Sequence, residues 1–255
     1  MGRTAIVTGA SRGIGHAVAL ALADEGFDIA AVALPDVERM ADLAGKISAR
    51  GRRFASYALD LGNVPDHGPV LEAIARDMGA VDCLVNNAGV SVRRRGDLLE
   101  VSPDSYDRCF DVNTRGTFFW TQAVARGMAA TPAPSGRHRS IVFVTSSNAV
   151  AASVERGEYC MSKTALSMAA RLFAIRMAPH GVGVYEVQPG IILTEMTQPS
   201  KARYDALIAE GLLVEPRWGR AEDVARTVRS MAAGLLPYTV GQEVRADGGL
   251  LLTRF

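Results

Sequence analysis

Thr4-Ala5-Ile6-Val7-Thr8-Gly9-Ala10-Ser11-Arg12-Gly13-Ile14-Gly15 is the stretch that decides the fold. Its first five residues predict a short apolar strand, and residues 17–22 carry apolar side chains at helical spacing. The glycines between them allow a tight turn and let a backbone approach a pyrophosphate, which a helix N-terminus favours electrostatically. Strand, glycine-rich turn and helix in this order are typical of dinucleotide binding. The spacing here is G-x-x-x-G-x-G rather than the common G-x-G-x-x-G.

The rest of the chain continues the alternation of strand and helix. Further strands are predicted at residues 29–34, 53–59, 83–85, 141–144, 182–187 and 240–246, and helices at about 36–50, 65–78, 103–130, 157–180 and 221–233. Residues 131–136 are rich in breakers and predict a surface loop. Apolar strands separated by helices indicate a parallel sheet covered on both faces. We therefore expect an α/β fold with one doubly wound domain over residues 1–255 and a parallel sheet of about seven strands.

Composition excludes several classes of protein. The 255 residues are 48% hydrophobic with a formal net charge of +1, so neither a nucleic-acid partner nor a membrane surface is expected. No apolar run reaches the roughly 20 residues of a membrane span. The three cysteines, Cys83, Cys109 and Cys160, form no metal-binding pattern and favour a reducing compartment. The chain enters a strand at once, without a leader pattern, and we expect a cytoplasmic protein.

Tyr159 and Lys163 form the strongest chemical signal in the second half of the chain. They stand four apart in a stretch with helical apolar spacing, so the phenol and the ammonium are expected on one helix face. A nearby positive charge lowers the pKa of a tyrosine. Such a tyrosine could act as a general acid or base near neutral pH. The alternative is a chance pairing of the two residues on a structural helix.

Several motifs together resemble the short-chain dehydrogenase/reductase family over essentially the whole chain. They are residues 8–15, Asn86-Asn87-Ala88-Gly89, Asn113 with Gly116, Ser146, Tyr159 with Lys163, and Pro189-Gly190 with Thr194. Within the family the chain looks most like bacterial 3-oxoacyl-acyl-carrier-protein reductases. The resemblance implies a Rossmann-like domain, an NAD(P)-dependent oxidoreductase that interconverts a ketone and a secondary alcohol, and a homotetramer.

The resemblance also implies a catalytic set. Tyr159 would be the general acid or base, and Lys163 would lower its pKa and hold the nicotinamide ribose. Ser146, thirteen residues before Tyr159, would hydrogen-bond the substrate oxygen. Asn113 would anchor a water in a proton relay behind Lys163. Structural alternatives are a strand-end turn for Ser146, which has Ser147 beside it, and local backbone bonding for Asn113.

Cofactor-binding residues follow from the same resemblance and from the strand ends at which they stand. They are Gly9, Ser11, Arg12, Gly13, Ile14, Gly15, Leu34, Asp60, Leu61, Asn87, Ala88, Gly89, Tyr159, Lys163, Pro189, Gly190, Ile192 and Thr194. No residue is assigned to a metal.

The choice of cofactor depends on the end of the second strand. A carboxylate there normally binds a free ribose 2′-hydroxyl, but the corresponding position is Ala33, and Asp36 comes three residues later, where it reads as a helix N-cap. Arg12 resembles the basic residue that pairs with the 2′-phosphate in NADP-using members. The sequence therefore favours NADP(H) over NAD(H), although no second basic residue stands at Ala33 or Leu34.

The substrate is not named by any motif. Residues 195–219 interrupt the alternation and are expected to form a lid over a small-molecule or acyl-carrier-linked substrate. Arg93, Arg94 and Arg95 could face an anionic substrate or carrier protein, or they could form a solvated surface. Three functions stay open: reduction of a 3-oxoacyl thioester, dehydrogenation of a sugar, polyol or other small alcohol, and a non-catalytic cofactor sensor or scaffold.

Overall fold

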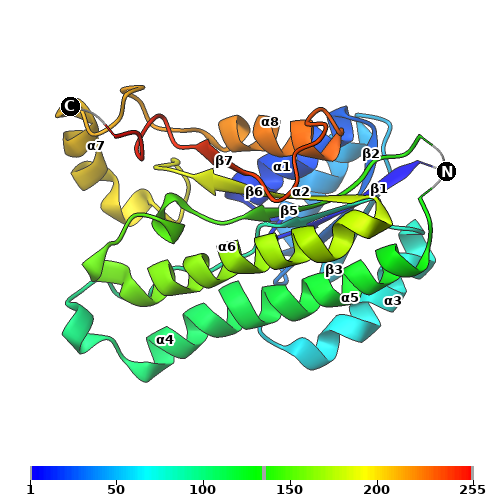
Figure 1. The fold of residues 1–255 in the computed structure, drawn as a ribbon, viewed down its shortest axis with the longest axis horizontal. Coiled ribbons are helices and arrows are strands. Elements are labelled where there is room, and N and C mark those ends of the chain that lie inside the picture. Colours follow the sequence, from blue (N-terminus) through cyan, green and yellow to red (C-terminus); the bar gives the residue numbers. More distant parts are fainter. Residues whose placement is uncertain (1, 134–135, 254–255) are drawn as a thin grey trace.

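A parallel seven-stranded sheet organises the protein. The computed structural model describes residues 2–133 and 136–253, and within them the strand order is β3-β2-β1-β4-β5-β6-β7 (Figure 1). The strands are β1 (Arg3–Thr8), β2 (Phe27–Ala33), β3 (Phe54–Ala58), β4 (Cys83–Asn86), β5 (Arg139–Val144), β6 (Val182–Pro189) and β7 (Glu243–Ala246). Both the α/β class and the predicted parallel sheet of about seven strands are confirmed.

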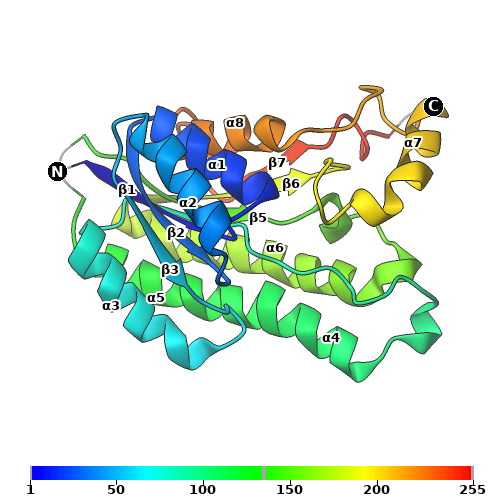
Figure 2. The same ribbon diagram turned by 180° about the vertical axis from the view of Figure 1, so that it is seen from behind.

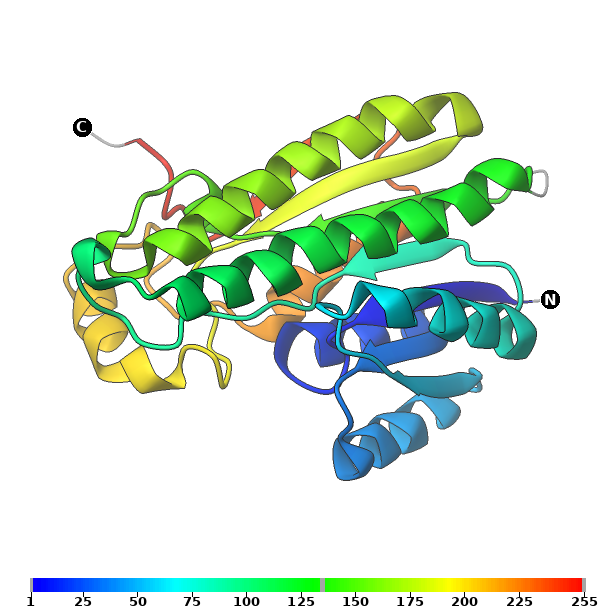
Figure 3. The ribbon, with the colours of Figure 1, turned by 90° about the horizontal axis from the view of Figure 1, so that it is seen from below.

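Helices cover both faces of the sheet. One layer holds α1 (Gly13–Asp24), α2 (Val37–Ser48) and α8 (Ala221–Ala232), and the other holds α3 (His67–Met78), α4 (Pro103–Phe110), α5 (Thr117–Ala130) and α6 (Gly157–Met177) (Figures 1 and 2). In Figure 3, α5 and α6 lie side by side across the second layer.

Strand periodicity explains why the sheet needs two helical layers. In β5, Val142 and Val144 pack in the core under α1 and α8, whereas Ile141 and Phe143 pack in the core under α5 and α6. All of β5 is buried. Successive side chains of a strand point to opposite faces, so the four consecutive apolar residues 141–144 require cover on both sides.

The predicted helical region over residues 103–130 is confirmed, with one feature that was not predicted. The helical path is continuous, but residues Asp111–Gly116 form a π-helical turn between α4 and α5. Gly116 sits against the backbone of Leu61, and a Cβ at this glycine would lie 2.1 Å from the Leu61 carbonyl oxygen. This close packing accompanies the wider turn, and it is a contact between distant segments that helical periodicity does not report.

Other boundaries shift by a few residues. Asp36 is the N-cap of α2, as predicted, and its side chain accepts a hydrogen bond from the Arg39 backbone N–H at 3.2 Å. The last strand is shorter than predicted and begins after Gly241, whose φ of 65° lies in the left-handed region. In the predicted 131–136 loop, residues 134–135 lie outside the described residues.

Residues 195–219 contain α7 (Lys201–Ala209) and stand beyond the carboxyl end of the sheet (Figure 2). Their apolar side chains form a small separate cluster around Ile191, Ile208 and Leu213. Tyr204 and Trp218 pack against this cluster edge to face, with ring centroids 5.8 Å apart. The segment therefore has its own packing next to the main core.

Residues 2–133 and 136–253 contain neither a candidate membrane span nor a candidate metal site. No helix in these ranges has the length and apolar character needed to cross a membrane. No three or more His, Cys, Asp or Glu side chains of the same ranges are arranged to hold a metal ion.

Candidate active site

The predicted site residues lie at the carboxyl ends of neighbouring strands. β1 has β2 on one side and β4 on the other, so the strand order reverses at this point. Gly9 follows β1, Asn87 follows β4, and Ser146 lies just past β5. Doubly wound sheets bind ligands in the crevice outside such a switch point. The structure therefore gathers these residues at the edge of the sheet where a ligand is expected.

Backbone geometry explains the glycines of the first turn. Gly9 and Gly13 have φ angles of 68° and 56°, which favour glycine. Gly15 is required for space, because a Cβ there would lie 2.1 Å from the Gly9 carbonyl oxygen and 2.5 Å from Asn87 Nδ2. Helix α1 begins here with no acidic residue in its first turn. With Ser11, Arg12 and Ile14, these residues form a cradle that fits a pyrophosphate.

Hydrogen bonds lock this cradle to the end of β4. The Thr8 hydroxyl accepts from the backbone N–H groups of Asn87 and Ala88, both at 3.0 Å, and Asn87 Nδ2 donates to the Thr8 carbonyl oxygen at 3.0 Å. Further along, a Cβ on Gly89 would lie 3.1 Å from Asn113 Oδ1 and 3.4 Å from Lys163 Nζ. The open backbone at Gly89 thus connects the cradle with the predicted catalytic residues, as an extended dinucleotide requires.

The remaining predicted cofactor residues flank the cradle. Leu34 follows β2 and is 62% exposed, whereas Leu61, after β3, is buried. Asp60 precedes it, and its side chain accepts from the Gly62 N–H at 2.9 Å. An exposed apolar side chain beside the crevice suits contact with an adenine ring.

The segment from Pro189 to Thr194 lies opposite the glycine-rich turn. Pro189 ends β6, and the Gly190 N–H donates to the Ala246 carbonyl oxygen at 3.0 Å. Ile192 is buried. The Thr194 methyl group lies 3.5 Å from the place where a Cβ on Gly13 would be. The predicted cofactor residues of the two segments are therefore close in space.

Two arginines and a glutamate meet beside this crevice. Arg12 Nη1 lies 2.6 Å from Glu195 Oε2, and Arg39 Nη2 lies 2.9 Å from Glu195 Oε1. Arg39 also pairs with Asp36 at 3.5 Å. Sequence reasoning singled out Arg12 but missed Arg39 and Glu195, because their meeting joins positions more than 150 residues apart. Arg39, in the first turn of α2, is thus a second cation in this region, and both arginines are paired with Glu195.

The predicted catalytic residues meet in the second helical layer, beginning with Asn113 in the π-helical turn. Asn113 is fully buried, and its side chain accepts from the Val90 N–H at 2.7 Å and donates to the Val90 carbonyl oxygen at 3.0 Å. Its Nδ2 also lies 3.0 Å from Ser162 Oγ, on α6. The wider turn therefore places Asn113 between the end of β4 and the helix of Tyr159.

Tyr159, Lys163 and Ser146 are all at least nine-tenths buried. Lys163 Nζ donates to the Val144 carbonyl oxygen at 3.2 Å and lies 5.9 Å from the centroid of the Tyr159 ring. Ser146 Oγ accepts from the Asn148 N–H at 3.1 Å. The helical spacing placed Tyr159 and Lys163 on one face, and the structure brings both to the end of β5.

The prediction that the pKa of Tyr159 is lowered is wrong. Burial raises the pKa of Tyr159, and the charge of Arg156 and a hydrogen bond with Ser146 oppose that rise. Burial also lowers the pKa of Lys163 to about 8, while the charge of Glu186 acts to raise it. Sequence spacing could not weigh desolvation against charge, because it does not report that both groups are buried.

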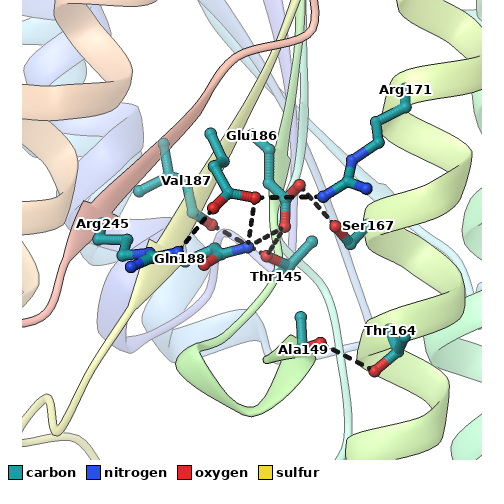
Figure 4. Close-up of polar contacts among 10 residues, drawn as sticks. Thr145, Ala149, Thr164, Ser167, Arg171, Glu186, Val187, Gln188 and Arg245 are labelled. Carbon is teal, nitrogen blue, oxygen red and sulfur yellow. Dashed lines mark hydrogen bonds and ion pairs between the residues drawn. The ribbon is translucent and has the colours of Figure 1, made fainter. Parts of the chain in front are cut away.

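Glu186 is a buried carboxylate behind Lys163, and sequence reasoning missed it. Figure 4 shows its partners: the hydroxyls of Thr145 and Ser167 donate at 2.6 and 2.8 Å, and Gln188 Nε2 donates at 2.9 Å. Glu243 lies in the same cluster and pairs with arginines of its own. Three neutral donors thus hold one negative charge in the interior beside the predicted active site.

Arg156 is a further cation next to Tyr159. Its guanidinium carbon lies 5.0 Å from the centroid of the Tyr159 ring. Arg156 is the N-cap residue of α6, and its backbone, with φ −155° and ψ 49°, is not helical. Helical spacing therefore does not predict its place beside Tyr159.

The arginine run and the 195–219 segment meet at the mouth of the site. Arg93 pairs with Asp104, and the Arg95 guanidinium lies 5.8 Å from the ring of Tyr204 on α7. Arg203, also on α7, pairs with Glu155. A cavity of about 450 Å³ opens between these elements. Arg93 is therefore already neutralised, which weakens the idea that the whole run faces an anion.

Comparison with known proteins identifies the family. The family model described as short chain dehydrogenase matches residues 3–205. The chain belongs to the short-chain dehydrogenase family, and it is an oxidoreductase.

Three similar proteins indicate the range of activities among the relatives of this chain. A 3-oxoacyl-[acyl-carrier protein] reductase from Brucella melitensis, solved with NAD, is 41% identical with a TM-score of 0.95, covering 100% of this chain and 99% of that one. A 2-dehydro-3-deoxy-D-gluconate 5-dehydrogenase from Dickeya dadantii is 30% identical over 98% of this chain and 96% of the relative. A putative 2-deoxy-d-gluconate 3-dehydrogenase from Agrobacterium tumefaciens, solved with NADP, is 29% identical with a TM-score of 0.82, covering 98% and 97% of the chains. These likenesses support a nicotinamide cofactor for this protein.

Proposed function

We propose that the protein interconverts a ketone and a secondary alcohol with Tyr159 as general acid and base. The convergence of Tyr159, Lys163, Ser146 and Asn113 at one end of the sheet carries this proposal. When bound, the nicotinamide supplies or accepts the hydride. A non-catalytic sensor or scaffold would have no chemical use for these four side chains in one place.

Each side chain has a distinct task in this mechanism. In reduction, Tyr159 donates its phenolic proton to the carbonyl oxygen, and in oxidation it takes the proton back. Ser146 donates a hydrogen bond to the same oxygen and stabilises the charge that develops there. The Lys163 ammonium stabilises the phenolate left on Tyr159. Asn113, fixed by Val90 and Ser162, orients the region through which a replacement proton reaches Lys163.

The substrate is proposed at the level of class. The likeness to the Brucella enzyme supports a 3-oxoacyl-acyl-carrier-protein reductase, and the likeness to the Dickeya enzyme supports a dehydrogenase of a sugar acid or other small alcohol. Reduced-nicotinamide absorbance with a panel of acetoacetyl thioesters, polyols and sugar acids tests both. Absence of turnover with every member and both cofactors would contradict the proposal.

NADP(H) is the proposed cofactor, because no carboxylate stands at Ala33 and because Arg12 and Arg39 meet at Glu195, from which a 2′-phosphate would draw them. Arg12→Ala and Arg39→Ala are each expected to lower kcat/KM for NADPH by about 10-fold or more, the value of one charge-assisted hydrogen bond. With NADH the same variants should change by less than about twofold, and Ala33→Asp should favour NADH by introducing the missing carboxylate. Steady-state kinetics with both cofactors measures these ratios.

A matched control is available on the far end of α2. Arg50 pairs with Asp24 on the surface at 2.7 Å, so Arg50→Ala should leave both cofactors unaffected. A clear preference of the wild type for NADH, or equal losses for both cofactors in Arg12→Ala and Arg39→Ala, would refute the assignment.

The rate of ketone reduction is expected to fall as pH rises through about 8. The Lys163 ammonium, with a pKa of about 8, is present below that pH and lost above it. Profiles of kcat/KM report ionisations of the free enzyme, so they should show the fall. Because the charge of Glu186 raises the pKa of Lys163, Glu186→Gln should move the fall to lower pH.

Glu243→Gln provides the comparison for this profile. Glu243 belongs to the same polar cluster but pairs with Arg171 and Arg245. Its loss should therefore leave the pH at which kcat/KM falls unchanged from the wild type. The role given to Lys163 would be contradicted if kcat/KM of the wild type stayed constant to about pH 10, or if kcat/KM of Glu186→Gln fell at a higher pH than that of the wild type.

Three broader features belong to the same proposal. Residues 195–219 act as a substrate lid on a single domain of residues 1–255, supported by their position at the mouth of the site.

A homotetramer is supported by exposed apolar side chains along one face of α6. They are Met161, Met168, Leu172 and Ile175, which expose 46–74% of their surface. Light scattering that finds only a 27.1 kDa species would contradict it. Three free cysteines support a cytoplasmic location.

A further inference from the structure

Arg156 is held in a defined position between Asn148, in the turn after β5, and Tyr159, in α6. One of its terminal nitrogens donates to Asn148 Oδ1. Asn148 is itself fixed, because its Nδ2 donates to the Ala151 carbonyl oxygen at 2.9 Å and its backbone N–H donates to Ser146 Oγ at 3.1 Å. The guanidinium is therefore tied through Asn148 to the serine proposed to hold the substrate oxygen, and it lies over the ring of Tyr159.

The charge of Arg156 has no counter-charge among residues 2–133 and 136–253. No carboxylate of these ranges forms an ion pair with it, and its buried Nε has no hydrogen-bond partner. The adjacent Glu155 pairs with Arg203 instead. In contrast, Arg12 and Arg93 near the same crevice each have an acidic partner. Because a partly buried charge without a partner is costly, its presence beside Tyr159 calls for an explanation.

We propose that Arg156 binds a carboxylate of the substrate, so that the ketone substrate is an oxo acid. The inference rests on the proposed function, since it takes Tyr159 and Ser146 as the residues that hold the carbonyl oxygen. Guanidinium N–H groups match the oxygens of a carboxylate. The guanidinium carbon lies 5.0 Å from the centroid of the Tyr159 ring, and its partner Asn148 donates its backbone N–H to Ser146, so the cation stands next to both residues proposed to hold the carbonyl oxygen. A carboxylate bound there would belong to the same small molecule, and the proposal places it one to three bonds from the reacting carbonyl.

This assignment separates the two substrate candidates. A 3-oxoacyl thioester carries no charge near its ketone, so it would leave Arg156 unpaired. An oxo acid neutralises Arg156, and it also removes a positive charge that favours the phenolate of Tyr159. The phenol then stays protonated, as an acid that donates its proton in reduction must be. Binding and proton transfer thus favour the same class of substrate.

Matched acid and ester pairs test the proposal with the full-length enzyme and reduced cofactor. The probes are acetoacetate, 2-oxobutanoate and levulinate, each compared with its methyl ester. The wild type is expected to prefer at least one acid over its ester by about 10–100-fold in kcat/KM, the value of a charged hydrogen bond. Arg156→Gln should reduce this ratio to about one, and Arg156→Lys should give an intermediate ratio. Arg93→Gln, which removes an arginine that already has a partner, should leave the ratio unchanged.

The possible results have separate meanings. Preference of the wild type for the esters, or an acid-to-ester ratio unchanged in Arg156→Gln, overturns the inference while leaving the oxidoreductase proposal intact. In that case Arg156 acts on Tyr159 alone. Turnover of no ketone in the panel by the wild type, with either cofactor, overturns the proposed function and the inference together.

Discussion

Tyr159→Phe is expected to fold, to bind cofactor and to lose about 10²–10⁴-fold in turnover, the range for a general acid or base. The change removes one oxygen from a ring that is 7% exposed, so the packing of α6 is preserved. Neither Ser146 nor Lys163 can replace the phenol, because Ser146 is not acidic enough and the Lys163 amine is directed to the Val144 carbonyl oxygen. Single-turnover and steady-state rates measure the loss, and cofactor fluorescence checks binding.

Tyr57→Phe is the matched control for this experiment. The Tyr57 hydroxyl lies 3.2 Å from Asp77 Oδ2 on the outer surface of β3, away from the crevice. Its removal should change turnover by less than about twofold, within the small effect usual for surface changes. If Tyr159→Phe kept near-normal turnover, or lost no more than the control, the general acid would have to be another residue.

Gly15→Ala is expected to be the most damaging single-methyl change in the cofactor crevice. The added Cβ would lie 2.1 Å from the Gly9 carbonyl oxygen, and backbone cannot rotate away as a flexible side chain can. Overpacking usually costs about 1–3 kcal/mol, and we expect about 3 kcal/mol or more here because the contact is with backbone. Any relief displaces the turn from Asn87, so cofactor affinity should fall as well.

Gly45→Ala adds the same methyl group where space is free. Gly45 lies within α2, and no atom lies within 4 Å of an added Cβ. The substitution should stabilise the protein by about 0.5–1 kcal/mol, because alanine favours helix over glycine. Denaturant unfolding and cofactor titration of both variants provide the comparison. Equal stability of the two variants would mean that the first turn adjusts more easily than its close contacts indicate.

Local patterns predicted the fold because β1, β2 and β5 each contain a continuous apolar run that leads into turn residues. β5 was recognisable from the apolar run of residues 141–144, β6 from Val182, Val184 and Val187, and the Asp36 cap from its place before an amphipathic helix. The π-helical turn at Asp111–Gly116 was not predictable, since it depends on the approach of Gly116 to Leu61. A single apolar period describes α4 and α5 equally well with or without it.

The site residues also fall into a group that sequence patterns predicted and a group that they missed. Residues within a motif, such as Tyr159 and Lys163, were named from their spacing together with the family resemblance. Glu186 was missed because it lies inside an ordinary apolar strand pattern and is surrounded by neutral donors from other elements. The meeting of Arg39 with Glu195 was missed because ion pairs between distant segments leave no local pattern. The pKa of Tyr159 depends on burial, which no motif reports.

The strand order also affects how the chain folds. β1 pairs with β4, with Ala5 opposite Cys83, so the crevice cannot form on a nascent chain that stops short of that strand. Each pairing in the sheet spans a crossover, and contacts of such high sequence separation make folding slow. Because the crevice exists only in the completed sheet, a cofactor that binds it withdraws the chain from the unfolded population by mass action. We therefore expect the free energy of unfolding of this protein to rise with the concentration of its cofactor.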